Sequence, residues 1–264
     1  MTSPTGQTAP PLPADDPELF EMDLRELRRR WAEAAERQPI SAEQMTGADR
    51  RAQAFGIPGE RLMEHAGTAV AAAVRAIAAS TGRSQRAVLI LCGPGNNGGD
   101  GLVAARRLAA SGARVVVALV ATESRPGTPD ARRNWDRLAE IEAVTRVHTP
   151  AGRDVAILAQ SLDEVSVVVD ALLGTGVRGT LREPIRSAVE LIQRARTAGI
   201  PVVAVDTPTA VDLTSGDASD PVASADLTVT FHRPKRGLLT RRGAALAGRV
   251  LVAPIGIPQV ADRD

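Results

Sequence analysis

The sequence predicts an α/β protein built on a mostly parallel, doubly wound sheet, and three observations support this. Short apolar runs recur along the chain, most clearly AVLILC at 87–92 and VSVVVD at 165–170. Unbroken runs of this kind indicate strands that are buried on both faces. Segments with helical spacing of apolar residues separate the runs, and alternating strands and helices are typical of parallel sheets. The 264 residues fit one such domain with additions.

Three parts are expected along the chain. Residues 1–15 are rich in proline and threonine and have almost no apolar bulk, so we expect a disordered tail. Residues 16–40 are expected to form a helical extension, whose early acids and late arginines match the helix dipole. Residues 41–264 form the main domain, and Ser41 to Gln44 has the form of a capping box that begins its first helix.

The main domain should begin with helices and continue as alternating strands and helices. Apolar residues at three- and four-residue spacing predict a long helix from Glu60, after a break at Ile57-Pro58-Gly59. Strands are expected at 87–92, 114–120, 144–148, 165–170, 202–206, 225–231 and 249–254. The helices between them are expected at 98–112, 131–143, 153–160 and 184–197.

The composition argues against several classes of function. Formal net charge is +1 and aromatic residues make up 2% of the chain, so neither a basic field nor stacking platforms favour nucleic acid. No apolar run reaches the roughly 18–20 residues that span a bilayer, so no membrane partner is expected. One cysteine, Cys92, excludes an internal disulfide, suits a reducing cytoplasmic location and belongs to an expected core strand. The three histidines lack zinc-site spacing.

Polar segments follow four of the expected strands at their carboxyl ends. Ligands of open α/β sheets bind in the crevice outside these ends. The segments should therefore meet on one rim, provided that their strands are neighbours in the sheet. They are GPGNNGGDG at 93–101, Asp170 with GTGVRGT at 174–180, DTPTAVD at 206–212 and HRPKRG at 232–237.

The segment 93–101 has the chemistry of an anion site, although it matches neither the common dinucleotide fingerprint nor the phosphate-loop fingerprint. Glycines let backbone amides approach a ligand, and the free N–H groups of the following helix favour phosphate. Asn96 and Asn97 add amide groups, while Asp100 could cap the helix, hold a sugar hydroxyl or neutralise a cation. The alternative is a glycine-rich turn that joins strand to helix without a ligand.

Four further residues are candidates, each with a structural alternative. Arg178 could contact a phosphate or be an exposed loop arginine. Asp170 needs a cation or backbone donors as partners, or else caps a helix. Asp206 could act as a general acid or base, or form an Asx turn. Lys235, the only lysine, either reflects codon usage that favours arginine or marks a site that does not accept arginine.

Together these segments resemble a known family. CGPGNNGGDGLVAARRL at 92–108 is similar to the signature of the YjeF N-terminal domain family, whose enzymes are NAD(P)H-hydrate (NAD(P)HX) epimerases. The resemblance runs from about residue 40 to 258. Other segments that match in the family's order are GIPGERLMEHAG, VDALLGTGVRG, VVAVDTPTAVD, ADLTVTFHRPKRGLL and GRVLVAPIGIP.

The resemblance implies a Rossmann-like three-layer α/β/α sandwich, a homodimer and a potassium ion near the substrate. The substrate would be NADHX or NADPHX, and the reaction would interconvert their R and S forms at C6 of the nicotinamide ring. Asp206 would be catalytic, and Asn97, Asp170 and Thr209 would hold the potassium. Residues implied to bind substrate are Asn96, Asn97, Gly98, Gly99, Asp100, Gly174, Thr175, Gly176, Val177, Arg178, Gly179, Thr180 and Asp206.

Departures from the family pattern leave a second hypothesis open. The family usually has Ser-Gly where this chain has Thr209-Ala210. It commonly has asparagine at the position of His65, and a histidine there could alter the floor of the pocket. The alternative function is a non-catalytic nucleotide-binding or protein-interaction module of the same fold. A sugar or nucleoside kinase is weaker, because no GxGD-type loop follows a late strand. The chain ends without the dehydratase domain fused to many bacterial members, so we expect a separate dehydratase partner.

Overall fold

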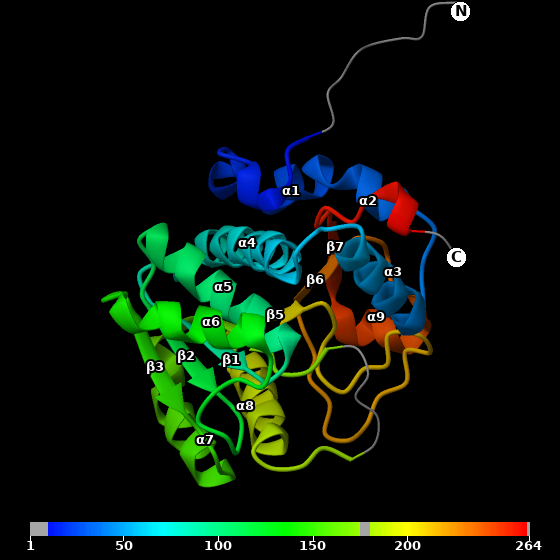
Figure 1. Cartoon of the computed structure of the whole chain (residues 1–264). Coiled ribbons are helices and arrows are strands. Elements are labelled where there is room, and N and C mark those ends of the chain that lie inside the picture. The colour runs from blue at the N-terminus through cyan, green and yellow to red at the C-terminus, as the bar shows by residue number, and fades with distance from the viewer. Residues whose placement is uncertain (1–9, 175–179, 263–264) are drawn as a thin grey trace, which may run out of the picture.

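A seven-stranded, all-parallel sheet forms the centre of the protein (Figure 1), whose computed structural model describes residues 10–174 and 180–262. The strand order is β3-β2-β1-β4-β5-β6-β7. Because β2 flanks β1 on one side and β4 flanks it on the other, the order reverses between β1 and β4, which is where open α/β sheets bind ligands. The strands are β1 (Ala87–Cys92), β2 (Val115–Leu119), β3 (Val144–His148), β4 (Val165–Ala171), β5 (Val202–Val205), β6 (Leu227–Phe231) and β7 (Arg249–Ala253).

Helices cover both faces of the sheet and produce the expected three-layer sandwich (Figure 1). Along β1, Ile90 and Cys92 join the core beneath α4, α5 and α6, whereas Leu89 and Leu91 join the core beneath α7 and α8. This split follows from the alternation of side chains along a strand. The helices of the main domain are α3 (Ala42–Ala54), α4 (Gly59–Ser80), α5 (Asn96–Ala110), α6 (Pro129–Arg137), α7 (Gly152–Leu158), α8 (Ile185–Thr197) and α9 (Arg241–Ala247).

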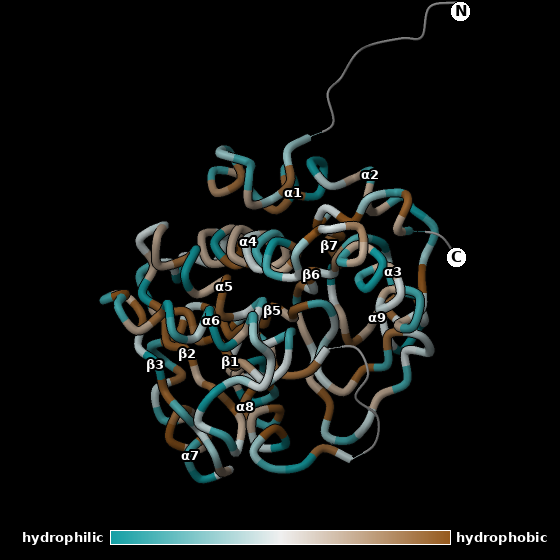
Figure 2. The backbone as a smooth tube through the Cα atoms, viewed as in Figure 1, coloured by the Kyte–Doolittle hydropathy of each residue, from teal (hydrophilic) through white to brown (hydrophobic). Residues whose placement is uncertain are grey.

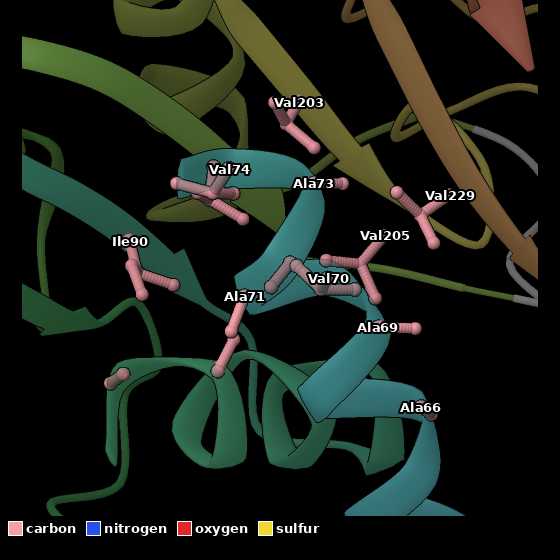
Figure 3. Packing of buried hydrophobic residues seen from close by; sticks show 14 of the residues in the cluster. Ala66, Ala69, Val70, Ala71, Ala73, Val74, Ile90, Val203, Val205 and Val229 are labelled. Carbon is pink, nitrogen blue, oxygen red and sulfur yellow. The ribbon is translucent and has the colours of Figure 1, made fainter. Parts of the chain in front are cut away.

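Helix α4 crosses the middle of one face and brings small side chains against the strands. Figure 3 shows Ala69, Val70 and Ala73 of α4 lying near Val205 and Val229, and all of these residues are buried. Figure 2 shows hydrophobic segments concentrated in the central strands and hydrophilic segments along outer elements such as α3. The alanine-rich face of α4 therefore lets a 22-residue helix lie close to the sheet.

The extension is helical but broken, which differs from one continuous helix. It contains one 3₁₀ turn, η2 (Leu19–Glu21), followed by α1 (Leu24–Arg30) and α2 (Ala32–Glu36). The Asp23 side chain accepts hydrogen bonds from the N–H groups of Arg25 and Glu26, and this capping box begins α1. A strong local cap has therefore interrupted the apolar periodicity.

The last residues of the expected disordered tail are ordered in the structure. Residues Pro13–Asp15 form the 3₁₀ turn η1, Pro13 is buried, and the Ala14 N–H donates to His65 Nδ1 at 3.2 Å. Contacts to α4 therefore order this stretch despite its composition. Residues 1–9, which hold most of the expected tail, lie outside the described residues.

The strand predictions are confirmed to within about two residues at either end, and the capping box at Ser41 is confirmed as the start of α3. Helix α5 begins at Asn96, two residues before the expected start at 98. This places Asn96 and Asn97 inside the first helical turn. No helix within 10–174 or 180–262 has the length and apolarity needed to cross a membrane.

Candidate functional site

The four polar segments meet on one rim because their strands are neighbours. Strands β1, β4, β5 and β6 are consecutive in the sheet. The Leu173 N–H donates to Thr209 Oγ1 at 3.2 Å, which joins the loops after β4 and β5. A Cβ atom placed on Gly174 would lie 3.2 Å from Asn97 Oδ1, so the loop after β4 lies against the start of α5. The adjacency on which the sequence argument depended is therefore present.

A cavity of about 540 Å³ opens on this rim. Its polar floor is formed by Asn96 and Asp100 of α5 and by Asp206, which directly follows β5. Helices α3 and α4, the segment that begins α6, and the ends of β6 and β7 supply the remaining wall. The wall residues are Met45, Thr46, Asp49, Gln53, Gly59, Leu62, Met63, Ala66, Thr128, Pro129, Asp130, Phe231 and Ile255.

The glycines of 93–101 serve mainly close packing, which differs from the expected approach to a ligand. A Cβ on Gly98 would lie 1.9 Å from the Gly93 carbonyl oxygen, and a Cβ on Gly93 would lie 1.8 Å from that of Leu172. Gly99 faces Met63, and its N–H is spent on the Gly95 carbonyl at 3.1 Å. Gly99 is therefore closely packed, and its contact with substrate stays a prediction.

The start of α5 still offers donors to a ligand. The N–H groups of Asn96, Asn97 and Gly98 precede the first intrahelical hydrogen bond, which is made by Gly99. The helix spans 15 residues, so its dipole also favours negative charge at this end. The anion-binding chemistry that the sequence suggested is available from backbone groups at this helix end.

Asp206 adopts a left-handed backbone conformation with a φ of 62°. Its N–H continues the sheet by donating to the Val229 carbonyl at 2.8 Å, and its side chain accepts the Thr230 hydroxyl on Oδ1 at 2.8 Å. The residue is 8% exposed and lines the cavity. Left-handed non-glycine residues are uncommon and gather at functional sites, and here the conformation sets Asp206 at the cavity floor.

Three other carboxyl groups, those of Asp49, Asp100 and Asp130, line the same cavity. Burial raises the pKa of Asp100 well above its usual value, and the charges of Asp206 and Asp49 raise it further. Burial also raises the pKa of Asp49, against a lowering effect from its hydrogen bond with Gln53. A site in which acids with different environments adjoin can hold a proton on one and a charge on another.

Lys235 was left undecided by the sequence, and the structure places it beside Asp206. Its side chain is fully buried, and its Nζ lies 3.5 Å from Asp206 Oδ1. Two features of the sequence could have identified it. Lys235 is the only lysine in a chain whose other basic residues are almost all arginine, and it follows an expected strand. Thr230 and Asp49 carried no such signal.

An oxygen-rich cluster lies beside the cavity, at the carboxyl end of β4. The Thr209 N–H and hydroxyl each donate to Asp170 at 2.7 Å, and the Leu172 N–H donates to it at 3.3 Å. Asp170 is fully buried, which raises its pKa to about 6, against the lowering effect of these hydrogen bonds. Backbone donors therefore supply part of the partnership that a buried carboxylate requires.

These residues fit a monovalent cation. Within the described ranges, Asp170 forms no ion pair with a basic side chain, so only hydrogen-bond donors partner its buried carboxyl group. The oxygen atoms of Asp170, Thr209 and Asn97 form a donor set of the kind that potassium prefers. Within residues 10–174 and 180–262, no cluster of three or more His, Cys, Asp or Glu side chains could hold a metal ion.

The described residues His65 and Thr180 do not line the cavity beside Asp206. His65 is 1% exposed and receives the Ala14 N–H, and it lines a separate cavity of about 250 Å³ with Leu12. The suggestion that His65 alters the floor of a substrate pocket stays a prediction. Cys92 is buried in β1, as expected. Thr180 is exposed, whereas Thr175, Gly176, Val177, Arg178 and Gly179 lie outside the described residues.

Comparisons with known proteins agree with this geometry. Residues 59–237 match the family model described as YjeF-related protein N-terminus. A protein of Cenarchaeum symbiosum named NAD(P)H-hydrate epimerase is 37% identical over 224 residues, covering 85% of this chain and 98% of that protein. A protein of Nitrosopumilus maritimus with the same name is 34% identical, covering 84% of this chain and 97% of that protein.

Longer relatives and a solved structure are also similar. The "Bifunctional NAD(P)H-hydrate repair enzyme Nnr" of Methanothermobacter thermautotrophicus is 43% identical over 222 residues, or 83% of this chain. The match spans only 40% of that relative's length. The crystal structure of the yeast protein ynu0 has a TM-score of 0.63 and 27% identity, and covers 76% of this chain and 83% of that chain.

Proposed function

The chain belongs to the family of proteins related to the YjeF N-terminus, and from this premise we propose that it interconverts the R and S forms of hydrated NADH and NADPH. Two relatives that match over nearly their full length carry the name NAD(P)H-hydrate epimerase. The observation that carries the proposal is the cavity in which Asp206, Asp100 and the start of α5 face one another. Such a site offers an acid, a base and an anion-binding helix end together.

The chemistry needs one acid and one base but no change of redox state. The carbon C6 of the hydrated ring bears a hydroxyl group and is bonded to the ring nitrogen, whose lone pair can expel the hydroxyl. Protonation of the hydroxyl releases water and leaves an iminium ion. Water then adds to the opposite face of C6 and gives up a proton. Ring opening and closure, the competing route, would need the same two groups.

Asp100 and Asp206 are suited to share this work. Burial and neighbouring carboxylates raise the pKa of Asp100, so it can hold the proton that the departing hydroxyl takes. Asp206 lies 3.5 Å from the Lys235 ammonium and lines the cavity, so its carboxyl group is placed to accept the proton of the adding water. Because the reaction runs in both directions, the two carboxyl groups exchange these roles.

The rest of the rim would bind the non-reacting parts of the substrate. The open N–H groups of Asn96, Asn97 and Gly98 are placed to receive pyrophosphate oxygens. Arg178 would add a forked contact to the same groups. A potassium ion held by Asn97, Asp170 and Thr209 would supply positive charge next to the substrate. Those residues hold the loops after β1, β4 and β5 together.

Three further features of the proposal concern context. The chain would act on both epimers of the hydrated nucleotides. A separate dehydratase would consume one of these epimers, as the bifunctional names of longer relatives suggest. A homodimer is proposed from the family resemblance. A reducing compartment such as the cytoplasm suits the single, buried Cys92.

The test is a coupled assay with a dehydratase that consumes only the S form. Pure R-NADHX is supplied, and its loss is followed by chromatography with and without this protein. We expect complete consumption of the R form with the wild-type chain. Asp206→Asn should slow it by about 100-fold or more, because general acid–base groups contribute roughly 10²–10⁴. Survival of the R form with the wild-type protein would contradict the proposal.

Asp217→Asn is the matched control, because Asp217 is an exposed carboxylate in the same loop. It should leave the rate unchanged. The competing hypothesis of a non-catalytic module predicts that the wild-type chain binds NADP⁺ yet leaves the R form intact. Equilibrium binding of NADP⁺ measured alongside the assay separates that outcome from a protein that is merely misfolded.

A further inference from the structure

The only lysine of the chain has its ammonium group buried among oxygen atoms. Lys235 Nζ donates to the Phe231 carbonyl at 2.6 Å, to Thr230 Oγ1 at 3.0 Å and to the Arg233 carbonyl at 3.1 Å. Its Nζ also lies 3.5 Å from Asp206 Oδ1. Removing an ammonium from water is costly unless it is paired and hydrogen-bonded, and this environment meets both conditions.

The backbone around Lys235 is fixed by the end of the extension. The Ile40 N–H donates to the Pro234 carbonyl at 2.9 Å, and the Arg236 N–H donates to the Ile40 carbonyl at 3.0 Å. Lys235 and Ile40 thus form a parallel bridge. The Arg233 side chain adds a hydrogen bond to the Gln38 carbonyl at 2.7 Å. Lys235 consequently lies in a segment whose backbone is hydrogen-bonded to Ile40 at the residues before and after it.

Thr230 connects the ammonium to Asp206. Lys235 donates to the Thr230 hydroxyl oxygen, and that hydroxyl donates its own proton to Asp206 Oδ1 at 2.8 Å. The shortest ion-pair contact of Lys235 falls on the same oxygen. Both interactions therefore engage Oδ1, which anchors this carboxyl oxygen between the ammonium and the hydroxyl.

We propose that Lys235 is a positioning residue, which holds Asp206 as an oriented carboxylate both directly and through Thr230. The proposal rests on the proposed function insofar as Asp206 is its acid–base group. Asp49, Asp100 and Asp130 line the same cavity as Asp206 and are its acidic neighbours there. Lys235 contacts Asp206 from the segment that follows β6 and places a positive charge beside it. Arg233 is the further charged group near Lys235, and His232 is the further titratable one.

An activity-independent experiment reads this pairing directly. Because the chain has one lysine, protein labelled with [¹⁵N]lysine gives a single side-chain resonance, which can be titrated by NMR. Burial lowers the pKa of Lys235, and the Asp206 charge raises it. Asp206→Asn should therefore lower the Lys235 pKa by about one unit or more, whereas Asp217→Asn should leave it unchanged. An unchanged resonance titration in Asp206→Asn would overturn the proposal.

The pH profile of the epimerase separates positioning from a merely structural role. In Lys235→Met, Asp206 loses its counter-charge and takes up a proton more readily. We expect the acidic limb of kcat/KM to move upward by about one pH unit or more, with most of the rate regained at high pH. Loss of rate by the same factor at every pH would overturn the positioning role.

Thr230→Val keeps the proposal testable if Lys235→Met does not fold. Valine keeps the branched shape of threonine in β6 but removes the hydroxyl that bridges the ammonium to Asp206. We expect a shift of the acidic limb in the same direction, smaller than that of Lys235→Met. An unshifted limb in folded Thr230→Val would contradict the bridge. If wild-type protein lacks epimerase activity, the proposed function fails, while the lysine titration still decides the pairing.

Discussion

Thr209 donates two hydrogen bonds to Asp170, one from its N–H to Oδ2 and one from its hydroxyl to Oδ1, each 2.7 Å long. The pair joins the end of β4 to the loop after β5, and neither residue is exposed to solvent. Two donors reduce the cost of burying a carboxylate but do not cancel its charge. A cation beside the Asp170–Thr209 pair would therefore stabilise the folded chain.

The first prediction is that potassium stabilises the protein through Asp170. A cation that binds only the folded state adds roughly 1.4 kcal/mol at ten times its dissociation constant. For a chain of this size we expect a rise in Tm of about 2–4 °C per kcal/mol. Thermal unfolding should be compared in potassium chloride and in tetramethylammonium chloride of equal ionic strength. A wild-type Tm that is the same in both salts would remove potassium from this site.

The variant Asp170→Asn should abolish the potassium-dependent part of the Tm, because an amide carries no charge to balance a cation. Thr209→Val provides the intermediate case, since it keeps the carboxylate and removes one oxygen ligand. A Tm of Asp170→Asn that still rises with potassium would place the ion elsewhere in the molecule.

The second prediction concerns Ala210, whose backbone is left-handed with a φ of 75°. An L-residue with a Cβ atom pays about 1–2 kcal/mol in this region, whereas glycine does not. Glycine costs roughly 0.5–1 kcal/mol of chain entropy in return. Ala210→Gly should therefore raise the free energy of unfolding by up to about 1 kcal/mol, measured as a higher denaturant midpoint with an unchanged m-value.

Ala218→Gly is the matched control in the same loop. Ala218 pairs with Val211 in an antiparallel bridge and packs against a small hydrophobic cluster, so glycine there brings the entropic cost and relieves no backbone strain. It should lower the free energy of unfolding by roughly 0.5–1 kcal/mol. If both glycine variants are destabilised alike, the left-handed backbone of Ala210 carries no strain.

The fold was largely predictable because parallel strands buried on both faces leave unbroken apolar runs. The run at 87–92 coincides with β1, and the weak run at 144–148 coincides with β3. The break in the extension at Asp23 was harder, because a capping box and an apolar periodicity competed there. The local cap won, since its two hydrogen bonds form within one turn.

The site was predictable only in part, because its contacts join distant segments. The sequence placed Asp170, Asp206 and the 93–101 loop at strand ends, but only the strand order decides whether those ends adjoin. Packing partners such as the Leu172 carbonyl against Gly93 leave no local pattern. The role of Lys235 depends on its contact with Asp206, which lies 29 positions earlier in the chain, so no local pattern predicts it.

The third prediction is a loss of stability in mild acid caused by His232. This residue is 2% exposed, and its Nε2 lies 2.9 Å from Asp262 Oδ1. Asp262 also pairs with Arg37 and Arg233, which ties the C-terminal segment to the extension. Burial lowers the pKa of His232 from 6.5 to about 4, although its contact with Asp262 opposes this and the charges of Arg37 and Lys235 add to it.

The sign of the effect follows from where the proton binds. Between pH 6.5 and about 4, the unfolded chain protonates His232 while the folded chain does not, so stability falls as pH falls through this window. At about 1.4 kcal/mol per unit, the loss approaches 3 kcal/mol at its lower end. The pKa of Asp262 is held below 3.8 by His232 and the arginines, so its own contribution is lost only at more acidic pH.

His232→Asn isolates this contribution, because asparagine tolerates the left-handed backbone at this position, where φ is 68°. Urea unfolding of wild type and variant should be compared at pH 7.5, 6.0 and 5.0. We expect the gap between the two free energies to change by about 1–2 kcal/mol over this range, in favour of the variant at low pH. Groups common to both chains, such as Asp170 and His65, cancel in that difference. Parallel curves would show that His232 does not exclude a proton from the folded state.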